Sequence, residues 1–201
     1  MKKLLAGIIL SLILAVPAVA AVKSPDKYIY DPAHTQIVFR VDHLGFSHPS
    51  GRFLKFSGGF VFDADTPENS DVNMIIQARS IDMGSSAWED VMKGSSFLKT
   101  DKYPDITFKS TKIVKTGART GNVTGDLTII GVTKPITLAV TYNKSGTHPY
   151  NKNYIAGFSA TGKIKRSDYG MDFGLPGIGD MVDIDVEVEG IRQDFGKLNT
   201  K

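Results

Sequence analysis

Apolar and polar side chains alternate with a period of two residues along most of the chain after residue 35. This alternation is typical of β-strands with one apolar face, because successive side chains of a strand point to opposite faces of the sheet. The clearest example is 181–191, where aliphatic side chains alternate with carboxylates. The pattern predicts eight strands, at residues 36–43, 53–63, 72–79, 106–114, 121–130, 136–143, 154–165 and 181–191.

Turn-forming residues separate most of these strands, for example at 65–69, 116–117 and 144–146. Short, regularly spaced strands with one apolar face predict an all-β fold, either a sandwich or an antiparallel up-and-down barrel. The third strand, 72–79, is apolar on both faces. We therefore expect its outer face to be covered, either by a helix or by a second copy of the chain in a homodimer.

Residues 85–100 have helical rather than strand periodicity. The apolar residues that recur at this spacing are Trp88, Val91, Met92 and Phe97, and Ser86 is a candidate N-cap. We expect a short helical insert between the third and fourth strands, where it covers the outside of a barrel or closes one of its ends.

The predicted inner face combines aromatic rings with small residues. The rings are Phe39, Phe60, Phe108 and Phe158, and the small residues are Gly58, Ala78, Gly125, Ala156, Ala160 and Gly162. An eight-stranded barrel is just wide enough to be filled by side chains or to hold one small ligand. Small residues opposite the rings favour a cavity, whereas glycines at coiled corners of the strands are equally compatible with a packed barrel.

The first twenty residues have the parts of a secretory signal peptide. Lys2 and Lys3 precede an apolar run at 4–16, and 18–20 reads Ala-Val-Ala, so cleavage is expected after Ala20. The apolar run is shorter than the roughly 20 residues needed to span a bilayer. We expect a signal peptide at 1–20, one barrel domain at 21–192 and a polar tail at 193–201, with an uncleaved anchor as the alternative. The mature chain is then periplasmic and has no transmembrane segment.

Composition excludes several classes of site. The chain has no cysteine, which excludes disulfides, a thiolate nucleophile, a cysteine-ligated metal and a lipoprotein anchor. The formal net charge is +3, and Lys2 and Lys3 leave with the signal peptide. The mature chain is close to neutral, so we expect no nucleic-acid partner.

Candidate catalytic and metal-binding groups are few. Asp42, His43 and Ser47 are close in sequence, but Asp42 and His43 are adjacent in a strand and therefore point to opposite faces, which a catalytic triad does not allow. The four histidines, His34, His43, His48 and His148, show no metal-ligand spacing, so no metal is expected. His34 follows Pro32, which favours a structural role in a loop.

Motifs spread over most of the mature chain resemble the YceI family. The pieces, in order, are Tyr28-x-x-Asp31-Pro32-x-His34, Phe39-x-Val41-x-His43-Leu44-Gly45-Phe46-Ser47, Gly51-x-Phe53, Ser80-Ile81-Asp82, Phe97-Leu98, Tyr103-Pro104-x-Ile106-Thr107-Phe108, Gly125-Asp126-Leu127-Thr128-Ile129-x-Gly131-Val132-Thr133-Lys134-Pro135, Arg166-Ser167-Asp168-Tyr169-Gly170 and Gly179-Asp180-x-Val182. The order and spacing together make the resemblance specific. One departure is the stretch 91–94, where the family usually has a His-Leu-Arg-like sequence and this chain keeps only the positive charge of Lys93.

The resemblance implies a lipocalin-like, eight-stranded antiparallel barrel that binds a long isoprenoid chain or similar amphiphile, with no cofactor and no enzymatic activity. We take as candidate ligand contacts Phe39, His43, Phe60, Trp88, Phe97, Phe108, Phe158 and Arg166. The alternatives are an enzyme acting on a quinone or polyprenyl substrate through His43 or Arg166, and a packed interaction module without a ligand.

Several of these residues have a second, structural interpretation. His43 either contacts a ligand head group or forms a hydrogen bond near the barrel mouth, and Trp88 and Phe97 either contact ligand or pack the helical insert on the barrel. Arg166 either gates the lumen or pairs with Asp168 across a turn. The glycine-rich segment 170–180 is either a lid or a plain loop.

Overall fold

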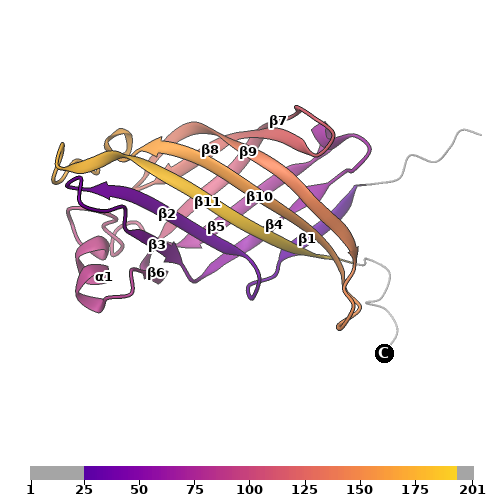
Figure 1. Ribbon diagram of the computed structural model, residues 1–201, viewed down its shortest axis with the longest axis horizontal. Coiled ribbons are helices and arrows are strands. Elements are labelled where there is room, and N and C mark those ends of the chain that lie inside the picture. The colour runs from indigo at the N-terminus through magenta and orange to yellow at the C-terminus, as the bar shows by residue number, and fades with distance from the viewer. Residues whose placement is uncertain (1–24, 194–201) are drawn as a thin grey trace, which may run out of the picture.

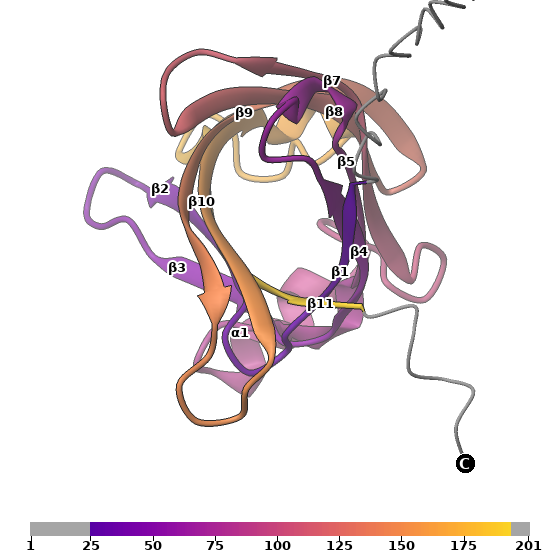
Figure 2. The ribbon, with the colours of Figure 1, turned by 90° about the vertical axis from the view of Figure 1, so that its right-hand side faces the viewer.

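Eight antiparallel strands pair edge to edge and close into a barrel (Figure 1, Figure 2). The structure is a computed structural model that describes residues 25–193, so the expected signal peptide and most of the polar tail lie outside the described residues. Closure comes from the pairing of the first strand with the last. The strands of the ring, in spatial order, are β1 (Asp26–Tyr30), β4 (Phe56–Phe62), β5 (Asp71–Gln77), β7 (Asp105–Lys115), β8 (Thr120–Ile129), β9 (Val132–Thr147), β10 (Tyr154–Lys165) and β11 (Ile178–Arg192).

Three further strands extend the sheet at one end of the ring. They are β2 (Gln36–His43), β3 (Ser50–Phe53) and β6 (Ile81–Asp82). Strand β2 pairs with β11 beyond the part of β11 that pairs with β1, β3 pairs with β2, and β6 pairs with β3. The chain therefore has three long strands that are each divided in two. Their halves β1, β4 and β5 stay in the ring, whereas β2, β3 and β6 depart from it. In Figure 2 the β2–β3 hairpin lies outside the outline of the barrel.

The break between β1 and β2 is held on β11 by the buried side chain of Thr35. Its hydroxyl donates to the carbonyl oxygen of Glu189 and accepts from the N–H of Glu189, both at 3.2 Å. The N–H of Asp31 donates to the same carbonyl at 2.8 Å. These bonds take the place of backbone hydrogen bonds at the break, where Pro32 has no N–H to donate. Strands β1 and β2 can therefore both pair with β11, while the backbone groups of Glu189 between them remain hydrogen-bonded.

The helix α1 (Ser86–Lys93) lies at the end of the barrel where β2, β3 and β6 depart (Figure 1). It confirms the predicted insert between the third and fourth predicted strands, although it is shorter than 85–100 and its N-cap is Ser85 rather than Ser86. The helix closes this end and does not cover the outer face of β5, where Ile75 is 38% exposed. The expectation that a helix covers that face is wrong. Within residues 25–193, no helix has the length and apolarity needed to cross a membrane.

All eight predicted strands are present, with differences at their breaks and ends. The predicted turn at 144–146 is wrong, because β9 continues through it to Thr147. The predicted strand 53–63 is divided between β3 and β4 at Leu54 and Lys55, and 72–79 ends at Gln77 and continues as a 3-10 turn, Ala78–Ser80. Strand β1 was not predicted. The β3–β4 break and the β5–β6 break lie side by side and are joined by backbone hydrogen bonds. The N–H of Leu54 donates to the carbonyl of Ser80 (3.1 Å), and the N–H of Gln77 donates to the carbonyl of Lys55 (2.9 Å).

The inward-facing glycines do not form the open space that the sequence suggested. A Cβ at Gly125 would overlap the ring of Phe108, and a Cβ at Gly190 would overlap the ring of Phe60. Each ring therefore fills the space beside a glycine of another strand. Gly58 has φ +107° and its α-carbon approaches the carbonyl of Asn73, so it is a coiled corner of the strand, and Ala78 lies in the 3-10 turn.

We expect Gly190→Ala to lower the free energy of unfolding by about 1–3 kcal/mol, because the added methyl displaces the Phe60 ring. That ring is stacked on Tyr28 at 4.9 Å between ring centres and cannot move freely. Urea unfolding measures the change. Gly157→Ala on β10 is the matched control, since its nearest neighbours would be at 3.7 Å. Equal stability of the two variants would contradict the account.

Candidate functional site

The barrel encloses a cavity of about 680 Å³ that is lined almost entirely by apolar side chains. The lining comes from the strands of the ring, from β2, β3 and β6, from α1 and from the segment before β11. Among residues 25–193 no carboxylate lines the cavity, and the charged lining residues are Lys115, Arg119 and Arg166. Lys115 and Arg119 belong to the β7–β8 hairpin, whereas Arg166 lies at the α1 end. The middle of the cavity is therefore apolar, with cationic groups near its two ends.

All eight residues selected from the sequence line this cavity: Phe39, His43, Phe60, Trp88, Phe97, Phe108, Phe158 and Arg166. Their contact with a ligand remains a prediction. Four further aromatic residues that were not predicted from the sequence also line the cavity: Tyr30, Phe62, Tyr142 and Phe173. Phe62 and Tyr142 belong to predicted apolar faces and the alternation could have identified them, whereas Phe173 lies in a loop with no periodic signal.

Aromatic rings from β4, β9 and β10 meet across the lumen, because β4 lies on the other side of the ring from β9 and β10. The Phe158 ring on β10 lies 5.4 Å from Phe60, 5.1 Å from Phe62 and 5.5 Å from Tyr142, measured between ring centres. Edge-to-face and tilted pairs of this kind hold rings in fixed orientations. Although these side chains point inward, Phe62, Tyr142 and Phe158 are only half-buried. Their remaining exposure is to the cavity, which is apolar surface available to a ligand.

At the α1 end, Arg166 is buried and binds the following loop through its guanidinium. The Nε donates to the carbonyl of Gly179 (2.8 Å), one terminal nitrogen to Met171 (2.6 Å) and the other to Ile178 (2.9 Å). Burial lowers the pKa of this guanidinium, while the nearby carboxylates of Asp180 and Asp172 oppose that effect. These bonds go to the carbonyl of Met171 in the loop and to those of Ile178 and Gly179 at the start of β11, so the interpretation of Arg166 as the partner of Asp168 is wrong.

Two aromatic contacts connect this end of the barrel. The ring of His43 on β2 lies 6.2 Å from that of Trp88 on α1, and the ring of Phe97 lies 5.7 Å from that of Phe173 in the loop before β11. The Asp42 carboxylate instead accepts from the N–H of Gly45 at 3.2 Å and lies 3.6 Å from His48. Asp42 and His43 therefore point to different neighbours, as the strand geometry predicted, and no triad forms with Ser47.

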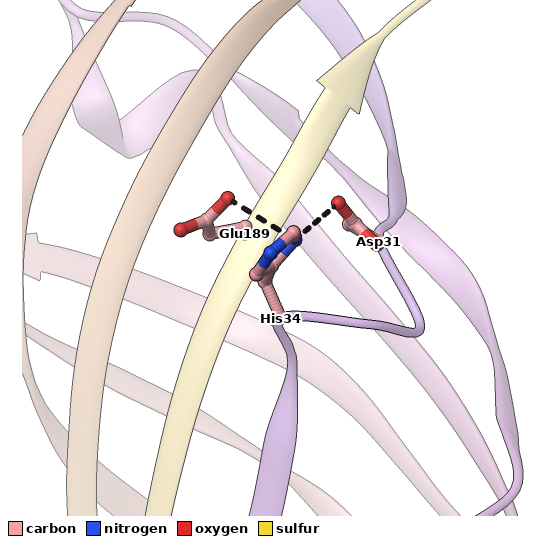
Figure 3. A group of neighbouring side chains, drawn as sticks. All are labelled: Asp31, His34 and Glu189. Atoms are coloured by element: carbon pink, nitrogen blue, oxygen red, sulfur yellow. Dashed lines mark hydrogen bonds and ion pairs between the residues drawn. The ribbon is translucent and has the colours of Figure 1, made fainter. Parts of the chain in front are cut away.

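A second group of polar side chains lies on the outside of the barrel, at the break between β1 and β2 (Figure 3). The Nδ1 of His34 lies 2.8 Å from the Asp31 carboxylate and 3.9 Å from the Glu189 carboxylate. Among the described residues, these three could together hold a metal ion. Without a metal, the imidazole is already bonded to Asp31 and fastens the loop over β11, which agrees with the structural role expected for His34.

The two partners of this group shift each other's pKa. The hydrogen bond that His34 donates to the Asp31 carboxylate, and the charges of Asp31 and Glu189, raise the pKa of His34. Burial acts to raise the pKa of Asp31, but the bonds from His34 and from the N–H of Ala33 lower it overall. The charged pair is thus favoured in the folded chain.

Comparison with known proteins identifies a family that covers most of the chain. Residues 28–190 match the YceI-like domain. The chain is 38% identical over 195 residues to protein YceI of Shigella flexneri, covering 96% of this chain and all of that protein. It is 36% identical, with the same coverage, to a UPF0312 protein of Vibrio parahaemolyticus.

Solved structures show the same fold. BcnA of Burkholderia cenocepacia matches with a TM-score of 0.73 and 27% identity, over 80% of this chain and 98% of that one. The Campylobacter jejuni YceI protein matches with a TM-score of 0.68 and 30% identity, over 76% and 90%. A polyisoprenoid-binding domain from Saccharophagus degradans matches with a TM-score of 0.61 and 15% identity, over 85% and 100%, and that likeness concerns the fold alone.

We expect the His34–Asp31 bond to stabilise the fold most between about pH 4 and 6.5. Because folding raises the pKa of His34 above its ordinary value of 6.5, protonated His34 stabilises the fold below pH 6.5. This stabilisation is lost as the pH rises through the pKa that His34 has in the folded chain. Because folding lowers the pKa of Asp31 below its ordinary value of 3.8, ionised Asp31 stabilises the fold above pH 3.8. This stabilisation is lost as the pH falls through the pKa that Asp31 has in the folded chain. In urea unfolding, His34→Gln should be less stable than the parent at about pH 5.5 and close to it at about pH 8.5.

His148→Gln is the control, because the imidazole of His148 accepts from the backbone N–H of Asn151 (3.4 Å) in the β9–β10 hairpin. A His34→Gln deficit of the same size at both pH values would show that the ion pair is not its cause.

We expect Arg166→Met to lower the free energy of unfolding by about 2 kcal/mol or more, because carbonyls of Met171, Ile178 and Gly179 lose their donor. Amide hydrogen exchange should accelerate selectively in residues 171–179. Arg79→Met is the control, since Arg79 forms an exposed ion pair with Asp101, which contributes about 0–1 kcal/mol. Equal unfolding free energies of the two variants would rule out the role assigned to Arg166.

Proposed function

Because the chain belongs to the YceI-like family and its barrel encloses an apolar cavity, we propose that it binds a long apolar lipid of the isoprenoid type inside the barrel. The lining of the cavity is the observation that carries this proposal. Its volume of about 680 Å³ lies within the roughly 300–1,000 Å³ of small-molecule sites. The Saccharophagus degradans domain, described as polyisoprenoid-binding, has the same fold and gives the class of ligand to test first.

The energetics favour a ligand that is long and mainly hydrocarbon. Each methylene moved from water into such a cavity contributes about 0.8 kcal/mol. Binding should therefore strengthen with chain length until the cavity is full. The cationic groups lie only near the ends, so an oxygen-bearing or anionic head group would be placed beside Arg166 or beside the β7–β8 hairpin, and the chain would occupy the middle.

We propose carriage or sequestration of this lipid rather than its chemical conversion. Arg166, one of the two residues that an enzyme would use, is occupied by bonds to three carbonyls. His43 lies against the ring of Trp88, and no carboxylate lines the cavity in residues 25–193 to orient or activate it. We further propose that the chain acts in the periplasm, to which the expected signal peptide at 1–20 would export it.

Mass spectrometry of the native protein from its own periplasm, before and after organic extraction, tests the proposal directly. We expect a discrete mass difference with an isoprenoid fragmentation pattern. A bare polypeptide mass, together with no uptake of polyprenyl or quinone lipids by the extracted protein, would overturn it.

Ala160→Phe tests whether the lipid occupies the cavity. Ala160 is on β10, lines the cavity and faces Val186 on one side and Val140 on the other. The new ring enters open space, so stability should change little, while uptake of a polyprenol should fall by at least about tenfold. Ala139→Phe is the matched control, because Ala139 pairs with Thr161 and is exposed on the outer face of β9. Equal uptake by both variants would place the lipid elsewhere.

A further inference from the structure

Large apolar side chains are exposed together at the α1 end of the barrel. The residues are Leu44, Phe46, Trp88, Val91 and Phe173, which we call the apolar rim. Phe46 is 87% exposed, and the other four are between 36% and 55% exposed. They come from the turn between β2 and β3, from α1 and from the loop before β11, which lie at the left end of Figure 1. Exposed apolar patches of this kind mark sites that bind a partner or a membrane.

Contacts between these three segments make the rim one surface rather than separate side chains. The N–H of Leu44 donates to the carbonyl of Gly177 at 3.0 Å, which joins the β2–β3 turn to the loop before β11. The Phe97–Phe173 ring contact joins that loop to the segment after α1, and the His43–Trp88 contact joins α1 to β2. The bonds of Arg166 hold the loop from inside.

The rim is continuous with the cavity. Trp88, Val91 and Phe173 are exposed at the surface and also line the cavity, whereas Leu44 and Phe46 extend the apolar surface outward and do not line it. An apolar path therefore runs from the interior of the barrel to the outside at this end. Charges of both signs accompany it, with Asp90 and Lys93 on α1 and Asp172 beside Phe173, so the surface has no strong preference for a charged partner.

We propose that the apolar rim inserts into the surface of a lipid bilayer, and that the ligand passes between bilayer and cavity at this end. The inference rests on the proposed lipid-binding function. A bilayer is favoured over a second copy of the chain, because a copy bound to the apolar rim would cover the path to the cavity. A bilayer instead has an apolar interior that can take up the rim, and it is also where an isoprenoid lipid resides. Passage at the rim keeps the lipid chain out of water, whose contact with hydrocarbon is unfavourable.

Co-sedimentation with phosphatidylcholine vesicles tests the proposal, and the chain carries its own probe, since Trp88 is its one tryptophan. We expect the protein to sediment with neutral vesicles at both low and about 1 M salt, because insertion is apolar and exposed charges are screened. Trp88 emission should shift to shorter wavelength and be quenched by lipids brominated on their acyl chains. Phe46→Ser should weaken vesicle binding about tenfold.

The control is Tyr150→Ser, at an 89% exposed aromatic residue in the β9–β10 hairpin at the opposite end of the barrel, which should bind vesicles as the parent does. Uptake of a polyprenol from detergent solution should be unchanged in Phe46→Ser, because Phe46 does not line the cavity. The proposal is overturned if the parent takes up polyprenol but ignores vesicles, or if Phe46→Ser instead dissociates a dimer in analytical ultracentrifugation. Vesicle binding without any polyprenol uptake would refute the proposed function and leave the docking surface standing.

Discussion

The whole barrel depends on the pairing of β11, which is bonded along its length on both sides. Strand β10 pairs with one edge, while β1 and β2 divide the other edge between them. Where they meet, the Thr35 hydroxyl takes the place of a backbone group opposite Glu189, and the His34–Asp31 pair fastens the loop outside. The ring can therefore close through β1 while β2 departs from it. That departure leaves one end of the barrel to be completed by α1 and the loop before β11.

The cavity follows from how the wall is built and not from the inward-facing glycines. The rings of Phe60 and Phe108 occupy the space that a side chain at Gly190 of β11 or Gly125 of β8 would fill, so these glycines accommodate rings and add no open volume. Packing density in an ordinary core would require side chains from opposite walls to interdigitate. Here such contacts across the lumen come from the rings of Phe62 on β4 and of Tyr142 and Phe158 on β9 and β10, while inward residues such as Leu138, Val182 and Ile184 stay only half-buried and line the cavity. The aromatic clusters keep this lining from collapsing inward.

The alternation of side chains was sufficient to predict the strands and the helical insert, because both follow from local periodicity. Strand β1 escaped prediction since only Tyr28 and Tyr30 point inward in its five residues, which is too short a pattern. The breaks in the composite strands were also missed, because they depend on hydrogen bonds between distant segments, as between Thr35 and Glu189. The same limit applies to the site. The sequence could place Phe39 and Phe158 on an inner face, but the carbonyls that bind Arg166 lie in the loop before β11 and at the first residues of β11, where no periodic pattern indicates them.

The buried charge of Arg166 connects the scaffold to the surface at the cavity end. A guanidinium removed from water needs partners, and the carbonyls of Met171, Ile178 and Gly179 supply them. Those carbonyls in turn are held in one arrangement, so the backbone between them is fixed although it carries no regular structure. Phe173 lies on this fixed backbone and is nevertheless 55% exposed. Its ring also contacts the buried ring of Phe97 and lines the cavity, so the bonds that satisfy the buried charge also hold a partly exposed apolar side chain at the mouth of the cavity.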